Sequence, residues 1–488
     1  MKKQPVSLDF DPIRFKSLIA QCADIIDQWY GSHLRGTPIY NNHSPAEIQA
    51  VFDEPLPGKG CEAEELLEVI RTKVFETSNF NPSPNYYGYI TGGGNQAALL
   101  AEILRNALNQ NNLKWHSAPA NSEIEKIVIR WICAFIGYPE DAAGVLVSGG
   151  SVANFLNLAV MRKVKCPIDM ANDGMYNAPI MTVYVSEQGH SSIDKGMDML
   201  GLGKKYLRKI PVDSDFKIDL ELLEHAIIED HEKGYLPSCI VGIAGTTNTG
   251  SVDPLRALGK LAQKHNLWYI IDGAYGLPGA GTELVGEQFD GLELADSILL
   301  NPHKWFFVPF EVACVIVRNK EHLRDTFSMV PDYLRGGKEQ SDREDLMDFN
   351  LQLTKDFKAL KVWMTFKAYG AEQLQKAIEN DCELARYAAD TIANSNDFEL
   401  LAPVPLSIVC FRYTGGASHD IEQLDKINNR LLQLIEEDGR VFFAGTKIKG
   451  QTSLRINLTN HRRTRTDIDF LFKVLRELGA KASTELKC

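Results

Sequence analysis

The sequence lacks any run of about 20 apolar residues, the length that crosses a bilayer, and its opening, MKKQPVSLDFDPIRF, lacks the continuous apolar segment of a signal peptide. Its nine cysteines are scattered singly, without a CxxC pair or a dense framework, as is typical of reduced thiols. These absences lead us to expect a cytoplasmic protein that does not contact the membrane.

The chain also lacks an excess of basic residues. Lys and Arg total 52 against 64 Asp and Glu, and the resulting net charge of -12 argues against a nucleic-acid-binding surface. Apolar residues at 44% and charged residues at 24% are ordinary for a folded protein, and no internal repeat is visible. The length of 488 residues predicts two or three structural units.

Short apolar runs alternate with longer, helix-compatible segments in the middle of the chain. The runs are GVLVS (144–148), MTVYVS (181–186), SCIVGIAG (238–245), LWYIIDG (267–273), SILL (297–300) and VACVIV (312–317). Because they are apolar throughout, they predict strands buried on both faces. The alternation predicts an α/β fold with a mostly parallel sheet covered by helices.

We expect three parts. Residues 1–95 would form an N-terminal helical segment that ends in an irregular loop, NPSPNYYGYITGGGN (81–95). Residues 96–365 would form the large α/β domain. Residues 366–488 change to helices with a few strands, which predicts a smaller α+β domain.

Two motifs follow predicted strands and contain residues suited to binding charged groups. In VSGGSVANF (147–155), Gly150 and Ser151 lie where a strand gives way to a helix, whose free N–H groups favour a phosphate. In IIDGAYG (270–276), Asp272 can hold a cationic partner such as a protonated ring nitrogen. Each motif could instead be an ordinary cap or turn. The spacings of a dinucleotide-binding loop and of a P-loop are both absent.

Two further stretches offer a histidine and a lysine. His190 lies among small residues in SEQGHSSID (186–194), where its ring could stack on a planar ligand or simply bond within a loop. Lys304 lies in NPHKWFFVPF (301–310), where its amine could snorkel to water or, if desolvated, bond to an aldehyde. Together with the phosphate cradle and Asp272, these residues meet the requirements of pyridoxal phosphate.

At this point the chain resembles the group II pyridoxal-phosphate-dependent amino-acid decarboxylases, which include enzymes for aromatic amino acids, histidine and glutamate. The resemblance is carried by SGGSVAN (148–154), AGTTNTGSVDP (244–254), DGAYG (272–276) and HKW (303–305). It implies a fold-type I enzyme and a homodimer with active sites near the subunit interface. No metal site is expected.

The resemblance also implies roles for individual residues. Lys304 would carry the cofactor, Asp272 would pair with its ring nitrogen, and His190 would stack on its ring. The remaining cofactor-binding residues would be Gly150, Ser151, Thr247, Ala274, Asn301 and His303. The precise contact of His303 stays open, between the phosphate and the reacting carboxylate.

Tyr333, in SMVPDYLRGG (328–337), matches the tyrosine of a mobile catalytic loop in the family. Its phenol is suited to reprotonating the α-carbon after carbon dioxide leaves. In relatives that act as aldehyde synthases, this tyrosine or the stacking histidine tends to be replaced. Because both are present here, the resemblance favours simple decarboxylation.

The substrate side chain is expected to contact Tyr89, Gly92, Trp115 and His116, the last two from NNLKWHSAP (111–119) across a subunit boundary. The aromatic residues favour an aromatic amino acid over an acidic or small polar one, and the glycines at 92–94 leave space. The chain departs from the family in LTKDFKALKVW (353–363), where Lys355 and Asp356 replace arginines. Lysine lacks the bidentate fork of arginine, which leaves the side-chain preference open.

Three alternatives remain at this stage. One is a decarboxylase for an acidic or small polar amino acid. Another is an aldehyde synthase or a carbon–carbon lyase on the same scaffold. The third is a non-catalytic binding module, which is disfavoured because Lys304, Asp272, His190 and Tyr333 are all intact.

Overall fold

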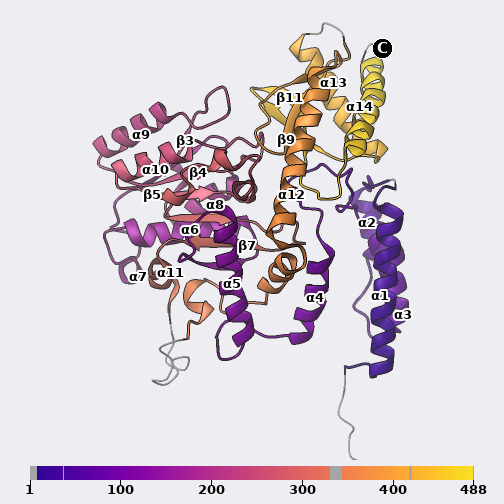
Figure 1. Cartoon of the computed structure of the whole chain (residues 1–488), viewed down its shortest axis with the longest axis horizontal. Helices are drawn as coiled ribbons and strands as arrows, with labels where there is room; N and C mark the ends of the chain where they lie inside the picture. Colours follow the sequence, from indigo (N-terminus) through magenta and orange to yellow (C-terminus); the bar gives the residue numbers. More distant parts are fainter. Residues whose placement is uncertain (1–7, 37, 330–342, 417–419, 487–488) are drawn as a thin grey trace, which may run out of the picture.

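A seven-stranded sheet forms the centre of the molecule (Figure 1). The computed structural model describes residues 8–36, 38–329, 343–416 and 420–486. The strands are β1 (Ala143–Val147), β2 (Met181–Ser186), β3 (Leu207–Ile210), β4 (Leu236–Ile243), β5 (Trp268–Asp272), β6 (Ser297–Leu300) and β7 (Ala313–Val317), in the order β1-β7-β6-β5-β4-β2-β3. Strands β2 to β6 are parallel to one another, whereas β7 is antiparallel to both β1 and β6. The predicted mostly parallel sheet is confirmed, and β3 is an additional strand.

Helices cover both faces of this sheet. One buried core combines strand residues with α6 (Gly150–Lys165), α8 (Ser191–Met199) and α11 (Lys320–Phe327). The core on the other face includes α5 (Pro119–Ile136), α9 (Leu220–Glu232) and α10 (Leu255–Lys264). Successive strand residues alternate between the two cores, as Val145 and Leu146 of β1 do, because side chains of a strand point to opposite faces. This explains why the strand sequences are apolar throughout.

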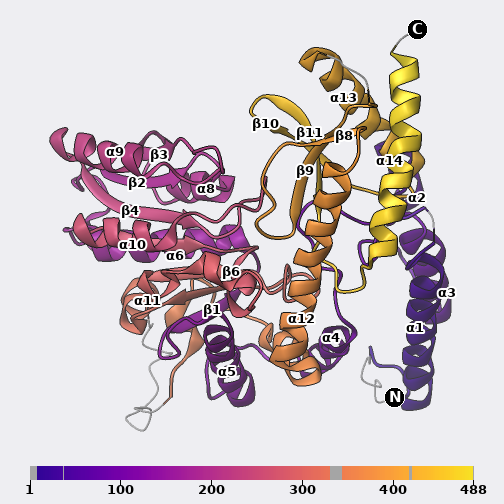
Figure 2. The same ribbon diagram turned by 45° about the horizontal axis from the view of Figure 1, so that its top comes forward.

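A smaller α+β unit follows. Its antiparallel sheet has the order β10-β11-β9-β8, and its strands are β8 (Phe398–Leu400), β9 (Ile408–Tyr413), β10 (Ala444–Ile448) and β11 (Gln451–Asn457). Helices α13 (Ile421–Asp438) and α14 (Arg465–Glu485) contribute to its core. The long helix α12 (Ala359–Ala393) runs between the two units, with a kink at Gly370, where φ is 70° (Figure 2).

The N-terminal helices lie to the side of the two sheets. Helices α1 (Pro12–His33), α2 (Pro45–Phe52) and α3 (Ala63–Val69) stand beside the small unit, and α4 (Gln96–Leu108) packs against α12 (Figures 1 and 2). The short helix α7 (Met170–Asp173) follows α6. Among the described residues, no helix combines the length and apolar character needed to cross a membrane.

Candidate active site

A cavity opens at the edge of the large sheet where β2, β4, β5 and β6 end. It is lined by Gly150, Ser151, Asn154, Gln188, His190, Ser192, Ile243, Gly245, Thr247, Asp272, Ala274, Tyr275, Asn301 and Lys304. The structure therefore brings together eight of the nine residues that the sequence suggested for the cofactor; His303 lies behind the lining. Carboxyl ends of parallel strands are the usual place for ligands in α/β sheets.

One end of this cavity is suited to a phosphate. Helix α6 begins at Gly150, and its N-cap, Gly149, offers no side-chain cap for the N–H groups of the first turn. A Cβ atom on Gly150 would lie 3.1 Å from Asn301 Nδ2, so the lack of a side chain keeps the approach open. Buried Asn301 Oδ1 has no hydrogen-bond partner within the described chain. A free helix N-terminus fits an anionic group, whereas the Asn301 Oδ1 carbonyl can only accept a hydrogen bond.

Asp272 provides a fixed carboxylate at the end of β5. Its Oδ2 accepts a hydrogen bond from Asn154 Nδ2 at 2.9 Å, and its Oδ1 accepts one from Ala274 N at 3.1 Å. Asn154 also donates to Ser192 Oγ at 2.9 Å. The sequence interpretation missed Asn154 and Ser192, although both lie inside quoted motifs. The three side chains hold a negative charge in one orientation, as a protonated ring nitrogen requires.

His190 caps the N-terminus of α8 and faces the cavity. Its Nδ1 accepts a hydrogen bond from Ser192 N at 3.2 Å and lies 2.7 Å from Ser192 Oγ. The surrounding protein lowers the pKa of His190 by desolvation, and Lys304 adds to this effect, while Asp272 opposes it. The imidazole is therefore neutral at pH 7, which suits stacking on a planar ring.

Lys304 follows β6 in a tight turn, where its N–H donates to Asn301 O at 2.8 Å. No ion pair to its amine exists in the part of the chain that the structure describes. Burial lowers the pKa of Lys304, Asp272 acts in the opposite direction, and Arg455 lowers it further. These surroundings shift the Lys304 amine toward its neutral form, the form that bonds to an aldehyde.

His303 contacts the protein rather than the open cavity. Its Nδ1 accepts a hydrogen bond from Val312 N at 3.1 Å, and its ring centroid lies 4.8 Å from that of Phe310. Its Nε2 lies 3.5 Å from Asn301 Nδ2, at the limit of a hydrogen bond. Burial lowers the pKa of His303 to about 3, so the ring is neutral. His303 therefore holds the turn that carries Lys304 to Val312, next to β7.

Tyr89 and Gly92 lie in the loop that leads to α4. Tyr89 is 58% exposed, with its ring 6.1 Å from that of Phe442. The sequence led us to expect that the glycines leave space for the substrate, but Gly92 leaves none. A Cβ there would lie 2.3 Å from Lys304 O and 3.1 Å from His303 O. Gly92 instead lets the loop pack on the backbone of the lysine turn.

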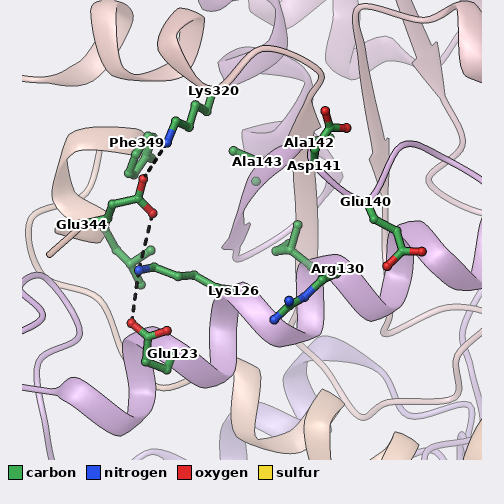
Figure 3. A pocket seen from close by; sticks show the side chains of 13 residues that line it. Glu123, Lys126, Arg130, Glu140, Asp141, Ala142, Ala143, Lys320, Glu344 and Phe349 are labelled. Carbon is green, nitrogen blue, oxygen red and sulfur yellow. Dashed lines mark hydrogen bonds and ion pairs between the residues drawn. The ribbon is translucent and has the colours of Figure 1, made fainter. Parts of the chain in front are cut away.

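Trp115 and His116 lie away from the residues that line the cavity. Trp115 N donates to Asp345 Oδ1 and its Nε1 donates to Glu123 Oε1, both at 2.8 Å. The adjoining hollow, in which Glu344 bridges Lys126 and Lys320, contains no residue predicted for the site (Figure 3). Tyr333 lies outside the described residues.

Arg455, on β11, is a candidate that the sequence interpretation missed. It is 6% exposed, its Nη1 donates to Thr247 O, and its Nε has no partner among the described residues. An arginine inside the apolar run SLRINLT was the available signal. A buried guanidinium with an unused donor, close enough to affect Lys304, is suited to an anion.

The chain is similar to known proteins over nearly its whole length. An aromatic-L-amino-acid decarboxylase of Bacillus atrophaeus is 29% identical over 99% of both chains. Tyrosine decarboxylase 4 of Petroselinum crispum is 29% identical over 96% of this chain and 93% of its own. A crystal structure of Oryza sativa TDC with PLP and tryptamine has the same fold, with a TM-score of 0.92, 24% identity and coverage of 98% and 99%.

The family model for the pyridoxal-dependent decarboxylase conserved domain matches residues 45–414, which include every residue that lines the cavity, whereas Arg455 lies outside this range. The chain therefore belongs to the pyridoxal-dependent decarboxylases, whose cofactor is pyridoxal phosphate.

Proposed function

We propose that this protein decarboxylates an aromatic L-amino acid to the corresponding amine and carbon dioxide. The observation that carries the proposal is that one cavity holds both a partly buried Lys304 amine, which has no ion pair among the described residues, and an immobilised Asp272 carboxylate. Pyridoxal phosphate, when bound, supplies an electron sink for the charge left by carbon dioxide. The activities of the aromatic amino-acid decarboxylases that resemble the chain support the reaction type and the substrate class.

Different side chains of the cavity would bind different parts of the cofactor. Gly150, Ser151 and Asn301 would bind the phosphate, and Asp272 would keep the ring nitrogen protonated. Lys304 would hold the cofactor covalently, and His190 would lie against its ring. Thr247 and Ala274 would complete the walls.

We propose that the Arg455 guanidinium binds the substrate carboxylate, because its Nε is unused and the residue is buried. Tyr333 would return a proton to the α-carbon, as the family resemblance implies. Tyr89, with its exposed ring next to Phe442, offers an apolar surface for a flat side chain. Gly92, Trp115 and His116 remain part of the substrate proposal, the last two from a second subunit.

We further propose a cytoplasmic homodimer that buries α4. Apolar side chains on one face of α4 are exposed in the single chain, namely Leu100 (57%), Ile103 (45%), Leu104 (53%) and Leu108 (51%). Their spacing places them along one stripe, and such a stripe in water is a common mark of an interface. The opposite side of the helix packs on α12.

The reaction is tested with purified protein, added pyridoxal phosphate and a panel of the twenty amino acids plus dihydroxyphenylalanine and 5-hydroxytryptophan. We expect amine and carbon dioxide in equal amounts from aromatic substrates. Turnover of acidic substrates alone would refute the aromatic preference. Aldehyde with peroxide in place of amine would refute simple decarboxylation.

The dimer is tested by light scattering. We expect twice the 54.5 kDa mass of one chain. Combined Ile103→Glu and Leu104→Glu should give monomers, whereas Leu222→Glu on α9, at a 47% exposed leucine outside the stripe, should leave the mass unchanged. A monomeric unsubstituted protein, or a dimer that survives both charges, would contradict the proposed interface.

A further inference from the structure

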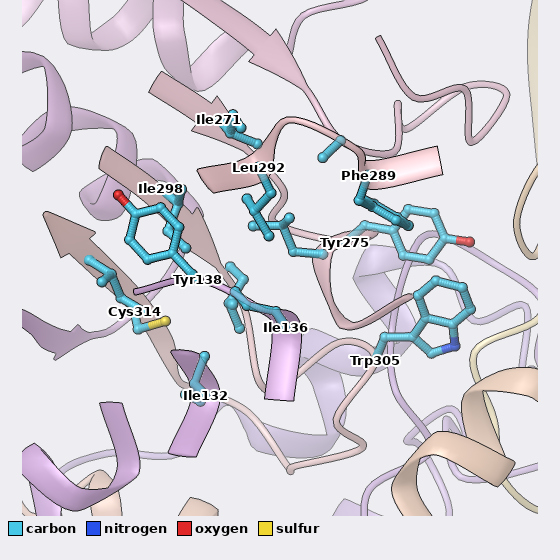
Figure 4. Packing of buried hydrophobic residues seen from close by; sticks show 14 of the residues in the cluster. Ile132, Ile136, Tyr138, Ile271, Tyr275, Phe289, Leu292, Ile298, Trp305 and Cys314 are labelled. Atoms are coloured by element: carbon cyan, nitrogen blue, oxygen red, sulfur yellow. The ribbon is translucent and has the colours of Figure 1, made fainter. Parts of the chain in front are cut away.

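Two buried aromatic rings stack beside the cavity: Tyr275, which lines it, and Trp305, which does not. The rings of Tyr275 and Trp305 stack with their centroids 4.9 Å apart and their planes 26° apart (Figure 4). Tyr275 follows Ala274, and Trp305 follows Lys304. The stack therefore joins the chain segment that carries Asp272 to the segment that carries Lys304.

The polar end of each ring is held by a residue from a distant part of the chain. The Tyr275 hydroxyl bonds to Ser407 Oγ and accepts a hydrogen bond from Ser407 N at 3.0 Å. Trp305 Nε1 donates to Asp381 Oδ2 at 3.0 Å. A buried indole N–H requires such an acceptor, because water cannot reach it.

Asp381, the acceptor for Trp305, is a carboxyl group whose burial costs free energy. It lies on α12 with no exposed surface, and no ion pair to it exists within the described ranges. Its Oδ1 receives only a long hydrogen bond, 3.4 Å, from Asn460 N. Burial raises the pKa of Asp381 to about 7, although Arg463 partly stabilises its charge.

The contacts of Arg463 explain why it does not neutralise Asp381 directly. Its donors bind the carbonyl groups of Pro84, Tyr86 and Asn457. Burying a carboxyl group away from a charge partner costs free energy, but an apolar residue at this site would leave the buried Trp305 N–H without its acceptor. What the Asp381 carboxyl contributes is the acceptor for the hydrogen bond from Trp305, the residue next to Lys304.

We propose that Asp381 is a positioning residue that acts on Lys304 through the indole of Trp305. The bond to α12 fixes the indole, the indole fixes the backbone of the lysine turn, and the turn sets the direction of the amine. The inference rests on the proposed role of Lys304 as the cofactor lysine. Reacting groups must be placed to within a fraction of an ångström, and a 1 Å error can cost about 100-fold in rate.

The test is a titration of the cofactor-free full-length protein with pyridoxal phosphate, followed by the visible absorbance of the bound cofactor. We expect Asp381→Leu and Trp305→Phe each to weaken cofactor binding by about 10-fold or more. Asp381→Asn keeps a carbonyl acceptor and should stay within about twofold of the unsubstituted protein. The double variant, Asp381→Leu with Trp305→Phe, should be no weaker than the weaker single one, because both changes remove the same bond.

Asp230→Leu is the control. Asp230 is also buried and accepts a hydrogen bond from an aromatic side chain, Tyr184 Oη at 2.9 Å. Unlike Asp381, it pairs with an arginine, Arg208, and its aromatic partner is not adjacent in sequence to a residue that lines the cavity. This variant should lower the unfolding temperature and leave cofactor affinity unchanged. If Asp381→Leu does not fold, Trp305→Phe and Asp381→Asn still decide the question.

The inference is overturned if Asp381→Leu or Trp305→Phe binds the cofactor as tightly as the unsubstituted protein, or if their effects add fully in the double variant. Lys304→Ala separates this failure from that of the proposed function. If Lys304→Ala keeps the normal absorbance, the lysine assignment itself is wrong and the inference falls with it. If Lys304→Ala loses the absorbance and Asp381→Leu retains it, the lysine assignment stands and the role of Asp381 alone is refuted.

Discussion

Lys304 and Lys355 both lie inside the large unit, but their surroundings are opposite. The Lys355 ammonium contacts the Glu125 carboxylate, and the two side chains are only 1% and 0% exposed. Lys304 has no such contact within the described chain, because Asp272 is held by Asn154 and by the N–H of Ala274. Burial alone therefore does not make a lysine reactive. Its amine must also lack a direct contact with a carboxylate.

The surroundings of Lys355 also explain the departure from the family arginines. Glu125 accepts further hydrogen bonds from Leu146 N at 2.9 Å and Asn112 Nδ2 at 3.3 Å, and Asn112 N donates to Lys355 O at 2.7 Å. Glu125 thus ties α5 to β1, and Lys355 ties the segment before α12 to both. Asp356 points elsewhere and pairs with Arg105 and Lys358. A structural tie to one carboxylate does not require the fork of arginine.

The largest expected effect comes from exchanging each lysine for alanine. Lys304→Ala should lower the rate of decarboxylation by about 10³-fold or more, because it removes both the covalent link and a proton carrier. Lys355→Ala should retain the visible absorbance of bound cofactor. The measurements are the decarboxylation rate and the visible absorbance spectrum of both variants. Equal losses of rate and absorbance in the two variants would contradict the proposed difference between Lys304 and Lys355.

The next effect is on stability. Lys355→Met should destabilise the fold by about 3–5 kcal/mol, because it leaves the Glu125 charge buried without its partner. Combined Lys355→Met and Glu125→Leu should recover much of this loss. Urea unfolding followed by fluorescence measures the change. An unfolding midpoint unaffected by Lys355→Met would show that the pair does not stabilise the fold.

A smaller effect concerns pH. The rate at which the cofactor-free protein binds pyridoxal phosphate should rise with pH as the Lys304 amine loses its proton. Because the Arg455 charge lowers the pKa of Lys304, Arg455→Met should move the midpoint of this rise to higher pH. Because the Asp272 charge raises the same pKa, Asp272→Asn should move the midpoint to lower pH. Stopped-flow absorbance gives both midpoints, and shifts of the same sign would contradict this account.

The smallest effect is expected at the surface. Lys426 and Glu422 form an ion pair on α13 with side chains 63% and 81% exposed. Water screens such a pair, so Lys426→Ala should leave the urea midpoint unchanged within error. A shift comparable to that of Lys355→Met would mean that burial is not what distinguishes these pairs.

Much of the catalytic edge could be predicted from sequence because its residues lie directly after apolar runs. Asp272 at the end of β5 and the Asn301–Lys304 turn after β6 follow this rule. The order of the strands was not predictable, since it depends on crossovers that local periodicity does not encode. Arg455 and Asp381 were missed because their partners, Thr247 and Trp305, are 208 and 76 residues away in the chain. The space expected beside Gly92 was misjudged because a missing side chain can admit backbone as readily as substrate.

The packing of Gly92 has a practical consequence for changing the enzyme's substrate range. Mutant libraries usually begin at small residues near a site, where larger side chains reshape the pocket. At Gly92 any side chain would press on the carbonyl groups of Lys304 and His303, which are rigid backbone. Tyr89, which is exposed three residues earlier, can vary without moving the lysine turn. Selection for a new amine product should therefore recover substitutions at Tyr89 and almost none at Gly92.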